Sequence, residues 1–393
     1  MNRTDNKYLV NWIDGMKISK THFIESENAL INLIQQTGSQ GLSSYNFGLL
    51  PISGGQSEAF HIEVSSEKVE LHRCLAVTRG GALINIDSEN TPALKRPFSD
   101  LFKPYELTAV KELYVVVKIN SFERVAYGKP DENMKPLRNP YTIPQYELEL
   151  VSPERLSSAD SVWYAMPLAK ITRDARGQVR DPDYIPPCNQ VLSSRVLTER
   201  SKQYVGYLAE INRLAQEVHN RAVARRQKEP NNTLAWDIQT FAAKTGEFIA
   251  NNYDNFRTLV LEMPPVFMTM TFARWARSTV AAVTFLNDSD YFLGYCNVYV
   301  KNFEEPRIFK TELDKMSNYE YNHFDVAKSI EMIENFYIRL HNLLEQLNHL
   351  EYKMVPKGDL VTRTWSEEPI NPRIPPTGQD KFKIRNKGDA SWF

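Results

Sequence analysis

The first half of the chain alternates apolar and polar residues over short runs, with the period of β-strands. The alternation covers residues 59–64 and 68–77, and Gly80-Gly81 separates the second run from residues 82–87. Glycine reaches positive φ without steric cost, so this pair predicts a hairpin turn. Three later runs predict further strands, at 113–119, 146–151 and 163–171. Short strands between turn signals indicate a sandwich or a barrel.

One helix interrupts this β pattern near the start of the chain. The helical period covers residues 20–36, and Ser19 stands where an N-cap is expected. We therefore predict a β-sandwich domain over residues 1–190 that carries one early helix.

The period changes after residues 181–187, DPDYIPP. Proline lacks an amide hydrogen and restricts the residue before it, so this segment marks a boundary. Successive helices are predicted after this boundary. The first ends near Lys228, the second covers residues 233–256, and the third begins after Pro264-Pro265. Residues 287–322 read as irregular.

The first and last helices of this second half carry apolar residues at steps of three and four, which is a heptad seam. With the two helices between them they predict an antiparallel helical bundle over residues 191–352. Strict seams also permit coiled-coil contacts between chains, so we expect an oligomer. The residues assigned to these contacts are Tyr204, Leu208, Ile211, Val218, Ile330, Ile333, Tyr337, Leu340, Leu344 and Leu347.

A proline-rich tail over residues 353–393 shows no periodicity and reads as extended. Its aromatic residues Trp365, Trp392 and Phe393 are candidates for contact with a partner. Packing of these rings back on the chain is the alternative interpretation.

Composition narrows the class of protein. Of 393 residues 42% are hydrophobic, and the net charge is −1. This balance supplies no overall field for nucleic acid, so no nucleic-acid partner is expected. Cys74, Cys188 and Cys296 are far apart and indicate buried free thiols in a reducing compartment. Charge interrupts every apolar stretch, which predicts a soluble cytoplasmic protein.

Catalytic motifs are absent from the sequence, including the phosphate-binding loop, the nucleophile elbow and HExxH. The seven histidines form no i, i+4 pair. We therefore predict no enzyme activity, no cofactor, no metal and no small-molecule substrate. A glycosidase carboxylate pair stays open, because sequence cannot show it. The basic run 221–228 is best explained by the helix macrodipole rather than by nucleic acid or lipid.

The segment Asn11 to Met16, NWIDGM, followed by His22-Phe23 is the most specific pattern in the chain. Its structural interpretation is a turn in which Trp12 fills a core, Gly15 has positive φ and His22 caps nearby backbone. Its functional interpretation is a partner-binding surface formed by Trp12, Gly15, Met16, His22 and Phe23.

This opening resembles that of the TssK family, the baseplate subunits of type VI secretion systems. Three later motifs resemble the family in the same order, namely MPLA at 166–169 with YIPP at 184–187, MPPVF at 263–267, and YNHFD at 321–325. The resemblance covers about residues 8–350. It implies a homotrimer with a β-sandwich shoulder that docks on the TssF and TssG wedge proteins, a helical neck, and a C-terminal head toward the membrane complex.

The end of the chain departs from that family pattern. After the last predicted helix only the tail remains, so we expect a divergent member without the usual head, whose tail contacts a membrane-side partner. The protein would then work at the cytoplasmic face of the inner membrane. Two alternatives stay open: a β-sandwich carbohydrate-binding protein or glycosidase with a helical appendage, and a phage-tail adaptor or receptor-binding protein.

Overall fold

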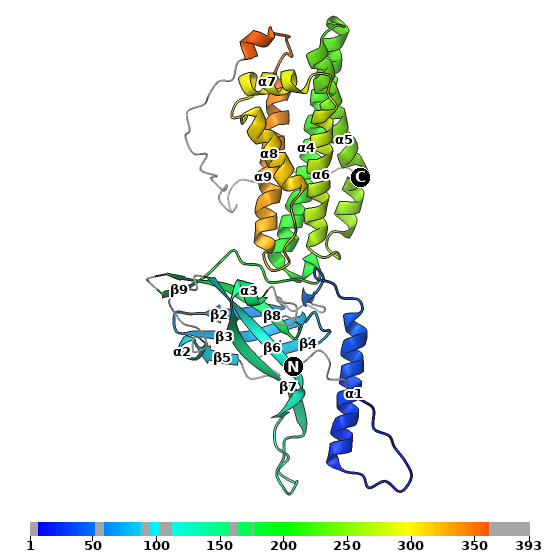
Figure 1. Cartoon of the computed structure of the whole chain (residues 1–393), viewed down its shortest axis with the longest axis vertical. Helices are drawn as coiled ribbons and strands as arrows, with labels where there is room; N and C mark the ends of the chain where they lie inside the picture. Colours follow the sequence, from blue (N-terminus) through cyan, green and yellow to red (C-terminus); the bar gives the residue numbers. More distant parts are fainter. Residues whose placement is uncertain are drawn as a thin grey trace, which may run out of the picture.

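The computed structural model describes residues 7–51, 59–87, 94–101, 112–156, 163–174 and 177–360. A β-rich half and a helical half lie end to end, and helix α1 (Lys20–Ser39) and the hairpin of β6 and β7 project from the β-rich half away from the helices (Figure 1). This order of a β-rich half followed by a helical half confirms the α+β part of the predicted fold class. The tail candidates Trp365, Trp392 and Phe393 fall outside the described residues.

The first sheet is built around β3 (Lys68–Val77). Strand β3 pairs antiparallel with each of four strands, namely β1 (Gly48–Leu49), β2 (Phe60–Val64), β4 (Leu83–Asp87) and β5 (Leu94–Pro97). The β3–β4 hairpin turns at Gly81, whose φ is +79°. The predicted Gly-Gly turn is therefore confirmed.

The second sheet has the order β7-β6-β8-β9 and is antiparallel throughout. Its strands are β6 (Glu112–Tyr127), β7 (Tyr141–Val151), β8 (Ala165–Asp174) and β9 (Gly177–Arg180). The strands β6 and β7 continue well past the runs that the sequence predicted. The two sheets share one apolar core, in which Leu71 and Ile84 of the first accompany Val117 and Leu150 of the second. The short helix α2 (Phe98–Leu101) adds Phe98 and Leu101 to this core, whereas Leu156 of α3 (Pro153–Leu156) packs in a second apolar cluster with Tyr114.

The helical half contains α4 (Arg195–Lys228), α5 (Thr233–Leu259), α6 (Val266–Thr284) and α9 (Val326–His349), at the places that the apolar periods predicted. Side-chain caps begin several of these helices. Ser194 accepts from the amide of Leu197, and Asn232 accepts from the amide of Ala235 at 2.8 Å. None of the described helices is both long and apolar enough to cross a lipid bilayer.

Residues 287–322, predicted to be irregular, contain two helices, which corrects that prediction. These are α7 (Ser289–Tyr299) and α8 (Pro306–Ser317). Asp288 caps α7 through the amide of Tyr291, and proline stands at the start of α8. Both helices are short, so each shows too few apolar repeats to reveal its period.

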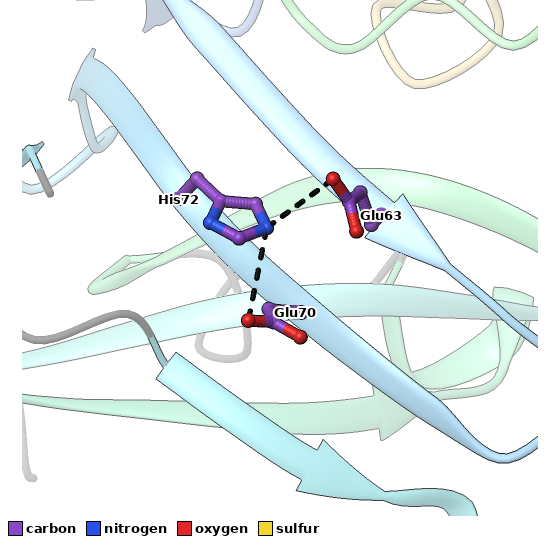
Figure 2. Close-up of side chains that lie close together, drawn as sticks. All are labelled: Glu63, Glu70 and His72. Carbon is purple, nitrogen blue, oxygen red and sulfur yellow. Dashed lines mark ion pairs between the residues drawn. The ribbon is translucent and has the colours of Figure 1, made fainter.

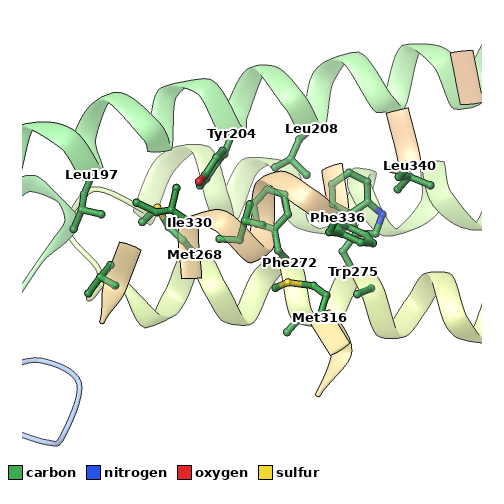
Figure 3. Packing of buried hydrophobic residues seen from close by; sticks show 14 of the residues in the cluster. Leu197, Tyr204, Leu208, Met268, Phe272, Trp275, Met316, Ile330, Phe336 and Leu340 are labelled. Atoms are coloured by element: carbon green, nitrogen blue, oxygen red, sulfur yellow. The ribbon is translucent and has the colours of Figure 1, made fainter. Parts of the chain in front are cut away.

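The seam residues assigned to contacts between chains form the core of a single bundle instead (Figure 3). Tyr204, Leu208 and Leu344 are fully buried, and Tyr337 stacks on Tyr207 with ring centroids 3.6 Å apart. Side chains already buried in one chain cannot contact a second chain unless the bundle opens. The heptad pattern is explained by packing of α4 and α9 against α5, α6 and α8. The residues relocated in this way to the core are Tyr204, Leu208, Ile211, Val218, Ile330, Ile333, Leu340, Leu344 and Leu347.

Backbone contacts fix the two halves to each other. The amide of Leu49 in β1 donates to the carbonyl of Pro187 at 2.8 Å, and Asn189 donates back to Leu49 at 2.9 Å. The motif before α9 reaches the same place, since the His323 ring bonds the Phe47 carbonyl at 2.8 Å. The motifs at 184–187 and 321–325 are therefore parts of this junction.

Residues 351–360, of which the sequence placed 353–360 in the tail, lie against the far end of the bundle. Tyr352 is buried, and its carbonyl accepts from Asn232 at 2.9 Å. The Tyr291 hydroxyl donates to the Val355 carbonyl at 2.7 Å, and Lys357 pairs with Asp288 at 2.6 Å. This stretch closes the bundle, so any separate tail begins after it.

Candidate partner-binding site

Exposed apolar side chains gather on the N-terminal segment and on α1. Trp12 is 48% exposed and Phe23 is 56% exposed. A core aromatic would be almost completely buried, so the predicted core position of Trp12 is wrong. We call this set the arm surface, and its members are Tyr8, Leu9, Trp12, Ile13, Ile18, Phe23, Leu30, Leu33 and Ile34.

The opening motif begins α1 in the way that its sequence suggested. Gly15 has a φ of +79° in the turn where the Met16 amide donates to Ile13 at 3.3 Å. The Ser19 amide donates to His22 Nδ1 at 3.3 Å, so His22 reaches back to the cap position. These contacts confirm the structural roles predicted for Gly15 and His22.

The same turn brings the predicted site residues together. The Trp12 ring lies 6.1 Å from the rings of both His22 and Phe23. Met16 is half-buried beside them. Trp12, His22 and Phe23 therefore form one aromatic patch at the start of α1.

The apolar side of α1 faces away from the β-rich half. Only Ala29 and Gln35 of this helix are buried. At 3.6 residues per turn, Phe23, Leu30 and Ile34 share the face opposite to those two. A surface helix normally turns its apolar stripe toward its own core. The outward stripe of α1 is therefore available to a partner.

Polar contacts hold the inner side of α1 on the β-rich half. The Gln35 side chain donates to Ser121 at 2.7 Å, and Arg124 donates to Asn28 at 2.9 Å while it pairs with Glu27. A Cβ added at Gly81 would lie 2.2 Å from the Gln35 carbonyl. The hairpin that carries Gly81 thus lets the helix backbone approach the sheet closely.

The extended β6–β7 hairpin projects on the same side of the molecule as α1 (Figure 1). Its exposed apolar residues are Val125, Met134, Leu137 and Tyr141. Asn139 donates to the Gly128 carbonyl at 2.7 Å and closes the tip. The β-rich half therefore ends in two projections that both present apolar side chains.

The basic end of α4 is occupied by contacts within the chain. Arg225 pairs with Glu229 at 2.6 Å, and Arg221 donates to the Leu350 carbonyl at 3.2 Å. The Arg226 guanidinium lies 3.6 Å from the centre of the Trp236 ring. These partners support the structural explanation of the basic run.

Comparison with known proteins supplies a family for part of the chain. Residues 116–242 match the family model T6SS_VasE, described as bacterial type VI secretion, VC_A0110, EvfL, ImpJ, VasE. The match spans β6 to the first part of α5 and includes the motifs at 166–169 and 184–187. The family resemblance predicted from the sequence is confirmed over these residues. No curated protein matches.

Solved structures of TssK resemble the chain at low identity. TssK from T6SS EAEC in complex with nanobody nb18 is 16% identical with a TM-score of 0.43, and the match covers 79% of this chain and 66% of that chain. A crystal structure of TssK is 13% identical with a TM-score of 0.44, and the match covers 86% of this chain and 70% of that chain. The baseplate complex from the type VI secretion system is 14% identical with a TM-score of 0.45, and the match covers 84% of this chain and 99% of that chain. This chain thus spans just under two thirds of the first of these.

Proposed function

We propose that this chain, whose residues 116–242 match the T6SS_VasE family of bacterial type VI secretion proteins, is a structural adaptor subunit of the secretion baseplate. In this role it works through protein contacts and has no catalytic activity. The observation that carries the proposal is the arm surface, where an apolar helix stripe and an aromatic patch face solvent.

The proposed partners of the arm surface are TssF-like and TssG-like wedge proteins. Large exposed apolar patches on soluble proteins are typical of protein-binding surfaces. Aromatic residues such as Trp12 and Phe23 are enriched among the side chains that dominate binding energy. The helix is fixed by Gln35 and Arg124, so little conformational entropy is lost when a partner binds.

The helical half is proposed to form the centre of a homotrimer and to point toward a membrane anchor at the cytoplasmic face of the inner membrane. Trimer contacts must use side chains other than the buried seam. Light scattering tests this part, because a trimer has three times the 45.4 kDa of the chain. A monomeric mass at micromolar concentration would rule the trimer out.

Co-expression with the neighbouring TssF-like and TssG-like proteins tests the adaptor function. Stable capture of both by the tagged chain is the expected result. Binding of neither protein, with all three soluble and folded, would contradict the proposed function.

A further inference from the structure

His72 and two glutamates, Glu63 and Glu70, meet on the neighbouring strands β2 and β3 (Figure 2). His72 Nε2 lies 3.5 Å from a Glu63 carboxylate oxygen and 3.8 Å from a Glu70 oxygen. His61 Nε2 lies 3.7 Å from the same Glu63 oxygen. The ligand atoms of Glu63, Glu70 and His72 all lie within 4.8 Å of one another.

An irregularity in the sheet places His72 in this cluster. His61 opposes Arg73, whereas the next residue of β2, Ile62, opposes Leu71. His72 is the extra residue of this bulge, and in the described pairings with β4 and β5 it has no partner either. Bulges re-aim side chains and are common beside functional sites.

The imidazole of His72 has an unused ring atom. Its Nε2 is shielded from solvent and has no hydrogen-bond partner within the described part of the chain. The ring stacks on His61 at a centroid distance of 4.9 Å. Buried polar atoms are normally satisfied, yet this Nε2 makes only long ion-pair contacts with the Glu63 and Glu70 carboxylates, an arrangement that a bound cation would complete.

The spacing of these atoms suits a small divalent ion. Zinc binds imidazole and carboxylate at about 2.0–2.2 Å, so tetrahedral ligand atoms lie about 3.4 Å apart. The separations of 3.5 and 3.8 Å between His72 Nε2 and the two glutamates are close to that value. They are too long for hydrogen bonds.

Two lysines share the Glu70 carboxylate with the cluster. Lys68 lies 2.9 Å from one oxygen, and Lys95 pairs with the oxygen that faces His72. Hydrogen bonds from Lys95 and then Lys68 lower the pKa of Glu70 to about 2, so the carboxylate is ionised at neutral pH. Lys95 therefore competes directly with any ion for this ligand atom.

We propose that His72, Glu63 and Glu70 form a binding site for a divalent transition metal of the zinc type. Imidazole with carboxylate is a ligand set that zinc accepts, whereas magnesium and calcium take oxygen ligands alone. The site joins two neighbouring strands and is independent of the proposed adaptor function.

Titration calorimetry of the full chain with zinc chloride tests the site. One ion per chain should bind, and His72→Ala should weaken binding by about tenfold or more. The matched control is His349→Ala, which removes an exposed histidine from α9.

Two further variants make the test decisive. Glu63→Gln removes a ligand from a largely exposed side chain and covers the case in which His72→Ala misfolds. Lys95→Met removes the competitor of the ion and should tighten binding, which a weak adventitious surface site would not show. The proposal is overturned if zinc fails to bind stoichiometrically, or binds equally well after both His72→Ala and Glu63→Gln.

Discussion

The His323 ring bonds the carbonyl oxygen of Phe47 at 2.8 Å, although the two residues are 276 positions apart. The other ring nitrogen lies 2.8 Å from the Tyr321 hydroxyl. His323 precedes α9 and Phe47 precedes β1, so this pair joins the helical half to the β-rich half. The motif that resembles the family entry to its last neck helix therefore has a structural role at the junction.

Burial lowers the pKa of His323 to about 4, against the weaker opposing effect of its bond to Phe47. An unfolded histidine has an ordinary pKa near about 6.5, so below that pH the unfolded chain takes up a proton that the folded chain does not. The contribution of His323 to stability is present above that pH and is lost as pH falls toward 4. This contribution of His323 to the free energy of unfolding is about 3 kcal/mol in total.

Urea unfolding at different pH values measures this effect. Between about pH 7.5 and 5 the wild type should lose about 2 kcal/mol more than His323→Gln, which cannot titrate. Equal losses in the two proteins would show that His323 is not held neutral at the junction.

Gly81→Ala should displace α1 without removing any side chain of the arm surface. The new methyl group would lie 2.2 Å from the Gln35 carbonyl, and the φ of +79° is unfavourable for alanine. We expect a destabilisation of about 1–3 kcal/mol and weaker partner capture. The control is Gly206→Ala in α4, where an added Cβ meets no atom within 4 Å. Unchanged stability and capture in Gly81→Ala would show that this approach does not position the helix.

Residues 351–360 should be needed for the stability of the bundle. A chain that ends at Leu350 lacks the buried Tyr352 and should be at least about 3 kcal/mol less stable than one that ends at Leu360. Thermal unfolding of the two truncated chains gives the comparison. Equal melting temperatures would mean that this stretch does not close the bundle.

The aromatic patch should matter little for folding. Trp12→Ala and Phe23→Ala each remove a side chain that is about half exposed, so each should change stability by less than about 1 kcal/mol. Trp275→Ala, which empties a fully buried position in α6, should cost about 3–5 kcal/mol in the same urea experiment. A large loss for Trp12→Ala would restore the interpretation of this residue as part of a core.

Local sequence signals predicted the elements whose periods are long and well terminated. The strand at 68–77 and the helix that begins at Lys20 were located correctly, because alternation and a cap residue mark them. Proline placed the start of α6. The short helices α7 and α8 were missed, since each spans only three turns or so.

The seam shows a limit of periodicity. A heptad pattern states that one face of a helix is buried, but it does not state whether the covering helix belongs to the same chain. Tyr204 and Leu344 satisfy the pattern inside one chain. Only the three-dimensional contacts separate these two cases.

The candidate site was predicted in part. Sequence placed Trp12, His22 and Phe23 in one motif, but the outward direction of α1 depends on contacts with Ser121 and Arg124, about ninety residues later. The His72 cluster gave no sequence signal, because a bulge and a neighbouring strand assemble it. A search for i, i+4 histidine pairs detects helical metal sites and misses a site built across strands.

Capture of the wedge pair by an arm variant tests the central claim most directly. The variant is Phe23→Ser with Leu30→Ser and Ile34→Ser, and its control carries serine at Leu259, Phe285 and Ile308, which are also exposed but lie on the helical half. The arm variant should keep the fold and oligomeric mass of the wild type and lose at least about tenfold in affinity for TssF-like and TssG-like proteins, while the control binds normally. Wild-type affinity in the arm variant would contradict the account.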